Sequence, residues 1–398
     1  MKPTTNYTKS GTFNIAYQVI GKGPVDLIYI PGWVSNIDMM WSEPRYATFL
    51  TRLTFFSRLI IFDKRGTGLS DRSDKYSTMD ERMEDIIAVM NATNSKKAFL
   101  FSHSEGGSVS LLFSLKYPEK TLGVVGFGIF AKRRFSEDYP WAPTDEEREV
   151  SNKLIEDNWA HGKLDELRTL VPSLAHDNGF MHWLASYLRS GGSPKAALIL
   201  HKQCTQIDVT AILGSIQVPT LLLFRKGDIE ILVEEGRYIA ERIANSKFVE
   251  LEGEDHLFWT GDTYPILAEI QEFMTGIRPH RTDFNNSKEE NKKSGIDIKT
   301  VMSENFLYNL KVEEFAKLCG RSLSAFKRDF KIAYNTTPSK WIKTKRLEYS
   351  KKLLLESSLN INEVCYECGF VNSSHYIKSF KEQYDIPPHQ FRLGHKVF

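Results

Sequence analysis

Residues 99–113 read FLFSHSEGGSVSLLF, and this stretch decides the fold of the longer part of the chain. A short apolar run ends in a turn of small residues around Ser104, and an apolar stretch with helical periodicity follows. The pattern predicts a strand, a sharp turn and a helix. In a G-x-S-x-G nucleophile elbow, a serine lies on such a turn with its hydroxyl above the edge of a sheet. Ser102 takes the first glycine position here, and a turn of small residues is also common in any doubly wound sheet, so other residues must decide.

The composition is that of a folded globular protein. The chain has 398 residues, 41% of them apolar and 26% charged, which suggests about two to three domains. It has neither an uncharged apolar run of membrane-spanning length nor an N-terminal signal peptide, so we expect no membrane partner. Four scattered cysteines are too few for a disulfide framework, and a cytoplasmic location is expected.

Charge is unevenly distributed along the chain. Residues 299–398 contain 17 Lys and Arg against 10 Asp and Glu, a net charge of +7. The whole chain carries +2, so the preceding residues carry −5. Such asymmetry indicates a nucleic-acid-binding part joined to a part of another kind.

Apolar, β-rich runs alternate with helical patterns in the first 275 residues, which predicts parallel βαβ units. The expected strands are residues 13–19, 25–30, 59–62, 99–103, 124–130, 218–224 and 248–251. Residues 76–92 are expected to form a helix that begins at Thr78, with Glu81 completing a capping box. Residues 132–213 are charged, rich in tryptophan and helical, so they read as a cap inserted between two strands. We expect its Trp141, Trp159, His182 and Trp183 to be pocket or cap-core residues.

Three residues that follow predicted strands supply the parts of a serine nucleophile site. They occur in the order Ser104, Asp228, His256, which is the order of nucleophile, acid and base in α/β-hydrolases. Parallel strands bring their carboxyl ends to one edge, where the three side chains would meet. The oxyanion donors are expected to be the backbone N–H of Glu105 and an N–H of Trp33 or Val34. No cofactor or metal is expected.

Residues 10–275 resemble an α/β-hydrolase. The motifs that carry the resemblance are PGW at 31–33, FDKRGTGLSD at 62–71 and SHSEGG at 102–107. The segment 62–72 also resembles hydrolase-like sensory domains that are often fused to bacterial nucleotide cyclases and regulators. The resemblance implies a mostly parallel sheet with a helical cap over the serine. The cap aromatics suggest an apolar or acyl-type ligand.

After a polar linker at residues 276–298, the chain is helical to its end and contains two similar units. In the first unit, residues 312–320 form a short helix with a glycine stop, and residues 322–331 form a basic helix. In the second, residues 361–370 precede a helix at 372–384. A long basic helix at 338–356 joins the two units. A helix, a glycine turn and a basic helix are typical of a helix-turn-helix, whose second helix enters the major groove.

The residues that face outward on the two second helices are the candidate DNA contacts. They are Ser324, Lys327, Arg328 and Lys331 in the first unit and Ser373, Ser374, His375 and Lys378 in the second. Cys365 and Cys368 have zinc-like spacing, but no second ligand pair accompanies them, so both are read as packing residues.

Residues 300–393 resemble the DNA-binding domain of the AraC family of transcription regulators. The motifs that carry the resemblance are AFKRDFK at 325–331, TP at 337–338, RL at 346–347, CGF at 368–370, SFK at 379–381 and IPPHQFR at 386–392. Asn335 and Asp385 stand where the family usually has glycine, and both residue types tolerate a left-handed backbone. The resemblance implies that outward residues of both second helices read bases while lysines bind phosphates.

The combined pattern predicts an α/β-hydrolase-like domain (1–275, with its cap at about 132–213) and a double helix-turn-helix domain (299–398). We expect a regulator that binds promoter DNA and senses or turns over a small ligand, through the linker or a homodimer interface. The alternative is a serine esterase or lactonase with an accessory DNA-binding tail. A receptor that binds its ligand without turnover is a third hypothesis.

Overall fold

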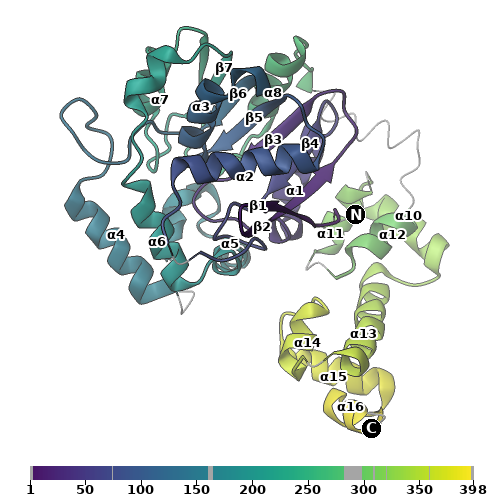
Figure 1. Cartoon of the computed structure of the whole chain (residues 1–398). Coiled ribbons are helices and arrows are strands. Elements are labelled where there is room, and N and C mark those ends of the chain that lie inside the picture. Colours follow the sequence, from purple (N-terminus) through teal and green to yellow (C-terminus); the bar gives the residue numbers. More distant parts are fainter. Residues whose placement is uncertain are drawn as a thin grey trace. The chain divides into compact units, whose positions relative to one another are not determined.

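The computed structural model describes residues 3–73, 75–159, 165–281, 298–307, 310–319, 321–357 and 359–395. The chain divides into two compact units, one that extends to His280 and one that begins at Arg281. This division falls within the predicted linker, of which residues 282–297 lie outside the described part of the chain. Figure 1 shows both units, with the chain coloured from purple at the N-terminus to yellow at the C-terminus.

The first unit is built on an eight-stranded sheet with strand order β1-β2-β4-β3-β5-β6-β7-β8. Its strands are β1 (Asn6–Ser10), β2 (Phe13–Ile20), β3 (Asp26–Ile30), β4 (Arg58–Phe62), β5 (Ala98–His103), β6 (Thr121–Phe127), β7 (Thr220–Arg225) and β8 (Ser246–Leu251). β1 and β2 are antiparallel to their neighbours, and every other pair is parallel. The sequence pattern missed β1, because its residues are polar and mostly exposed at the sheet edge.

Helices cover both faces of the sheet. The helices are α1 (Pro44–Leu53), α2 (Met79–Ala92), α3 (Gly106–Lys116), α7 (Val233–Ala240) and α8 (Tyr264–Thr275), and Figure 1 shows α2 and α3 alongside the strands. Successive strand residues point to opposite faces, so Ile28 packs with the core beneath α2 and α3 while Tyr29 packs with Phe258. Thr78 caps α2, and both hydrogen bonds of its capping box with Glu81 are present, as predicted.

The segment between β6 and β7 begins with a loop at residues 128–144 and is mostly helical after it in the described residues. It contains α4 (Asp145–Asn158), α5 (Asn178–Gly191) and α6 (Pro194–Cys204), with short 3₁₀ helices around them. β6 ends at Phe127, three residues earlier than the apolar run predicted, because the chain turns at Gly128 in a left-handed conformation (φ 52°). No helix among the residues with assigned structure is long and apolar enough to cross a bilayer.

The second unit consists of helices joined by short loops in its described residues. Its helices are α10 (Ile298–Asn305), α11 (Val312–Leu318), α12 (Leu323–Tyr334), α13 (Pro338–Glu356), α14 (Ile361–Glu367), α15 (Ser373–Tyr384) and α16 (Pro388–His395). Two apolar cores hold it together, one for each predicted helix-turn-helix. Phe315, Phe326 and Phe330 are central to the first core, and Val364, Tyr376 and Phe380 are central to the second. Gly320, the predicted glycine stop of the first unit, lies outside the described residues.

Candidate functional site

Ser104 lies on the turn between β5 and α3 in a left-handed backbone conformation, with φ of 52°. A residue other than glycine rarely adopts this conformation, and such strain is typical of a nucleophile elbow. The neighbouring glycines are required by space, since a Cβ at Gly106 would collide with the carbonyl oxygen of Ile30. The buried Ser102 hydroxyl donates a hydrogen bond of 3.0 Å to the Val125 carbonyl, so this position accommodates serine in place of glycine.

Asp228 and His256 follow β7 and β8, and their side chains form a buried pair. His256 Nδ1 lies 2.7 Å from Asp228 Oδ2. The other carboxylate oxygen of Asp228 accepts hydrogen bonds from the backbone N–H of Glu230 and of Ile231. Burial disfavours the charged imidazole, but the Asp228 carboxylate outweighs that effect and raises the pKa of His256. Ser104 and His256 line the same pocket.

The backbone N–H groups of Trp33 and Glu105 have no hydrogen-bond acceptor among the described residues, and both residues line the pocket beside Ser104. The buried Lys64 connects their two loops, because its Nζ lies 2.8 Å from the Gly32 carbonyl oxygen and 2.8 Å from Glu105 Oε2. Arg82 pairs with the same carboxylate at 2.6 Å. Burial acts to raise the pKa of Glu105, but the charges of Arg82 and Lys64 outweigh burial. The pKa is therefore lowered and the carboxylate stays ionised. Two donors are therefore available for an oxyanion.

The segment 62–72 forms the loop after β4 and is organised by the buried carboxylate of Asp63. Asp63 accepts hydrogen bonds from the Ser35 hydroxyl at 2.7 Å and from the Leu69 N–H at 2.9 Å. Gly68 has a φ of 52°, and a Cβ there would collide with the Asp63 carboxylate. Burial raises the pKa of Asp63 to about 6. Through Asp63 and Lys64, the segment 62–72 therefore holds the loop that carries Trp33 in place.

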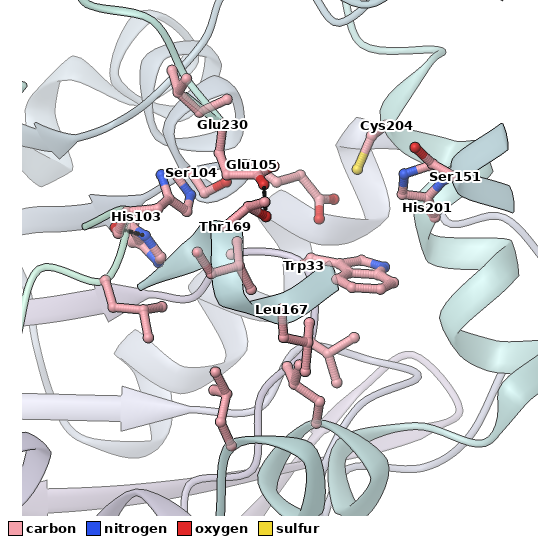
Figure 2. Close-up of a pocket in the computed structure, with 18 of the residues that line it drawn as sticks. Trp33, His103, Ser104, Glu105, Ser151, Leu167, Thr169, His201, Cys204 and Glu230 are labelled. Carbon is pink, nitrogen blue, oxygen red and sulfur yellow. Dashed lines mark hydrogen bonds between the residues drawn. The ribbon is translucent and has the colours of Figure 1, made fainter. Parts of the chain in front are cut away.

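A pocket of about 350 Å³ lies at Ser104, and residues of the cap helices α4, α5 and α6 line part of its wall. Figure 2 shows Ser104 and His103 on one side of it and Ser151, His201 and Cys204 on the other. Apolar side chains line much of its surface, among them Trp33, Leu154, Ile155, Trp159, Leu184 and Leu188. Its size suits a small molecule.

The four cap residues singled out in the sequence occupy different places. Trp159 lines the pocket and donates a hydrogen bond to the Gly192 carbonyl. Trp141 packs against Tyr139, Trp183 stacks on Tyr187, and His182 is exposed.

Sequence reasoning missed the polar residues that the cap and its entry segment contribute to the pocket, namely Arg133, Arg148, Ser151 and His201. Arg148 and Ser151 belong to the charged stretch DEEREVSNKLIEDN, which resembles a solvated helix. No local signal marks them, because their burial depends on where the cap folds back over the sheet.

The second candidate site consists of α12 and α15, the second helix of each helix-turn-helix unit. Ser322 caps α12 and Asn372 caps α15, each through a side-chain hydrogen bond to the first turn. Asn335 and Asp385 end these helices with φ of 51° and 64°. Both therefore adopt the left-handed conformation for which glycine is usual, as their residue types suggested.

The predicted DNA contacts lie on the solvent side of these two helices. Seven of the eight side chains are exposed, and Ser373 is half-buried. Between the two units, α13 contributes Ile342 to the first core and Leu347 and Leu354 to the second. The sequence thus places both candidate faces correctly on the outside, and their contacts with DNA stay a prediction.

Cys365 and Cys368 are buried in the core of the second helix-turn-helix, and burial raises the pKa of both thiols. Within the described ranges, no group of three acidic, histidine or cysteine side chains is arranged to hold a metal ion.

Comparisons with known proteins assign each unit to a family. Residues 40–257 match the family described as serine aminopeptidase, S33, and residues 315–394 match a helix-turn-helix domain family. The virulence regulon transcriptional activator VirF of Yersinia enterocolitica is 32% identical over 96 residues, which are 24% of this chain and 35% of VirF. The regulator ExsA of Pseudomonas aeruginosa is 29% identical over 97 residues, again 24% of this chain and 35% of the relative. The chain thus spans about a third of the length of these curated relatives.

Solved structures resemble the first unit. An esterase from Exiguobacterium antarcticum superposes with a TM-score of 0.60 at 18% identity, covering 68% of this chain and 99% of the esterase. An enol-lactonase from Burkholderia xenovorans gives a TM-score of 0.59 at 15% identity, covering 68% of this chain and all of the lactonase. At these identities the likeness shows the fold alone. The chain belongs to the serine aminopeptidase S33 family of α/β-hydrolases, and its C-terminal unit is an AraC-type helix-turn-helix DNA-binding domain.

Proposed function

We propose that this chain is a transcription regulator in which a small acyl-type ligand occupies the Ser104 pocket and in which α12 and α15 bind promoter DNA. The observation that carries the proposal is the presence, in one chain, of a pocket of about 350 Å³ and two exposed basic helices. Matched relatives include transcriptional activators and a further transcriptional regulator, each matching about a quarter of this chain.

The proposed DNA-binding mode follows from the double helix-turn-helix. Residues 324, 327, 328 and 331 of α12 and residues 373, 374, 375 and 378 of α15 would enter successive major grooves, about 34 Å apart along the duplex. Lysines along α13 would neutralise phosphates between the two grooves.

The proposed chemistry at the pocket is nucleophilic acyl transfer. His256 removes the proton of the Ser104 hydroxyl as the oxygen attacks the ligand carbonyl, and Asp228 stabilises the imidazolium that results. The imidazolium then gives this proton to the leaving oxygen as the acyl C–O bond breaks, which leaves the acyl group on Ser104 until water hydrolyses the new ester. The N–H groups of Trp33 and Glu105 stabilise the oxyanion. Ligand occupancy can alter DNA binding only if the ligand binds the DNA-bound and DNA-free forms with different affinity.

The proposal is tested by measuring DNA binding with the pocket filled and empty. An operator is first selected from random duplexes with the full chain. The labelled operator is then titrated with protein that has reacted with a fluorophosphonate and with unreacted protein. We expect the two dissociation constants to differ by about fivefold or more. Ser104→Ala, treated in the same way, corrects for effects of the reagent elsewhere, and identical curves with and without the adduct would reject a sensing role.

The second candidate function is that of a serine esterase or lactonase whose DNA-binding domain only localises it. The buried His256–Asp228 pair beside Ser104 favours this candidate. Ser104→Ala separates the hypotheses in cells. Loss of transcriptional output would make turnover or covalent capture part of sensing, and unchanged output would leave Ser104 as a ligand contact. Failure of a fluorophosphonate to label Ser104 would favour a receptor that binds without turnover.

A further inference from the structure

The cap wall of the Ser104 pocket contains a buried arginine. Arg148, Ser151 and Ile155 are three and four residues apart on α4, so they lie on one face of the helix, and all three line the pocket. Arg148 is only 5% exposed. In Figure 2, Ser151, which lies one turn further along α4, is on the side of the pocket away from Ser104.

Arg148 has no protein partner for two of its donors. Its Nε and Nη2 atoms are buried without a hydrogen-bond acceptor in the described part of the chain. Asp145, an acidic residue whose charge acts on Arg148, has an exposed side chain that pairs with Arg134 at 2.6 Å. Glu105, which lines the same pocket, already pairs with both Lys64 and Arg82. A buried charge is normally paired, so these two donors are available to an anionic group of a ligand.

The neighbouring groups do not remove the charge of Arg148. Burial, aided by the nearby Arg133, lowers its pKa to about 10, so it stays protonated at neutral pH. His201 lies on the same wall, where burial and the arginines lower its pKa to about 4, so it is neutral. Arg133 has its own partner, because its Nη1 lies 3.6 Å from Glu235. Among the described residues of this wall, Arg148 is therefore the cation that a ligand can neutralise.

We infer that Arg148 binds a carboxylate, and that the ligand has an apolar body with this carboxylate at the end away from Ser104. The inference rests on the proposed ligand-binding role of the pocket. Nε and Nη2 form one edge of the guanidinium, and two parallel N–H donors on one edge match the two oxygens of a carboxylate. Trp33 and Trp159 supply the apolar surface for the body of the ligand.

Short fatty acids and their amides test this site, because they differ only in the group that Arg148 would recognise. Butanoate, hexanoate and octanoate, with the three matching amides, are titrated calorimetrically into the full chain. We expect at least one acid to bind about tenfold or more tightly than its amide. Arg148→Met keeps an unbranched apolar stem but removes the guanidinium, and it should abolish this preference. Arg134→Met removes an exposed arginine that does not line the pocket and should leave the preference intact.

Two results would overturn the inference. One is that the unaltered chain binds acids and amides equally or binds neither, and the other is that the preference for the acid survives in Arg148→Met. The melting temperature without ligand separates binding from folding. Removing an unpaired buried charge should leave it unchanged or raise it, whereas a large drop would assign Arg148 a structural role instead. The readout involves neither DNA nor turnover, so a failure here leaves the regulator proposal standing, and identical operator curves would leave this result standing.

Discussion

At the scale of single residues, the chemistry of the pocket depends on the protonation of His256. The neutral imidazole is the form that can take the Ser104 proton. Asp228 raises the pKa of His256 above its ordinary value of 6.5, so the competent form is reached only at higher pH. We expect the rate of fluorophosphonate labelling to rise with pH and to reach its midpoint above 6.5. Gel fluorescence from about pH 5 to pH 9 measures this profile.

Asp228→Asn provides the matched comparison for that profile. Without the carboxylate, burial becomes the largest effect on His256 and acts to lower its pKa, so the midpoint should move down. Ser104→Ala should show no labelling at any pH. If the midpoint is the same in the unaltered chain and in Asp228→Asn, the His256–Asp228 pair does not control the reactivity of Ser104.

The nucleophile, acid and base could be predicted as candidates because each follows a strand in a fixed order along the chain. Arg148 could not, because it stands in a charged helix, and only the tertiary fold buries it at 5% exposure. The role of Lys64 was equally hidden, since it bridges two loops that are separate in sequence. Local patterns report periodicity and turns, and they carry no information on which charged side chain ends up inside.

At the scale of elements, α12 and α15 each end at a residue type that tolerates a left-handed backbone. Asn335 and Asp385 both lie in the left-handed region. We expect Asn335→Gly to leave the free energy of unfolding unchanged or to raise it slightly, and Asn335→Val to lower it by about 1–2 kcal/mol. Denaturant titration of both variants measures the difference. Equal stability of the two variants would contradict the assignment of a left-handed cap.

The exposed face of α12 gives a prediction about DNA. Lys327→Ala should weaken operator binding by about 1–3 kcal/mol if the side chain contacts a base, and should flatten the salt dependence if it contacts a phosphate. Lys226→Ala removes the same charge from an exposed position in the first unit and should change neither quantity. Fluorescence anisotropy at several salt concentrations distinguishes the outcomes. If Lys327→Ala changes neither the affinity nor its salt dependence, this face of α12 does not contact the operator.

Helices were predicted more accurately than the sheet edges. The structure reproduces residues 338–356 as α13 and the Thr78 cap of α2, because amphipathic periodicity and capping residues are local signals. β1 escaped prediction because an exposed edge strand needs no apolar alternation. The described part of the cap is mostly helical from Asp145 onward, as predicted. The residues that line the pocket could not be predicted, because the sheet beneath the cap determines which face of each helix turns inward.

At the scale of the whole molecule, the two units have separate apolar cores. We therefore expect calorimetric unfolding of the full chain to show separable transitions. Operator DNA should raise the melting temperature of the C-terminal transition by mass action while the other stays in place. Phe380→Ala removes a ring from the core of the second helix-turn-helix and should identify the same transition by lowering it. A single transition that both changes shift together would show that the units unfold as one.

The division of the C-terminal unit into two cores has a consequence for how such a protein can diversify. A substitution near Phe326 alters packing around one helix-turn-helix, while the other keeps its own apolar core, and α13 contributes to both cores. Selection can therefore retune recognition of one half of a promoter site while the other half continues to anchor the protein. A single substitution can therefore give the protein a new promoter, and no intermediate variant has to lose DNA binding altogether.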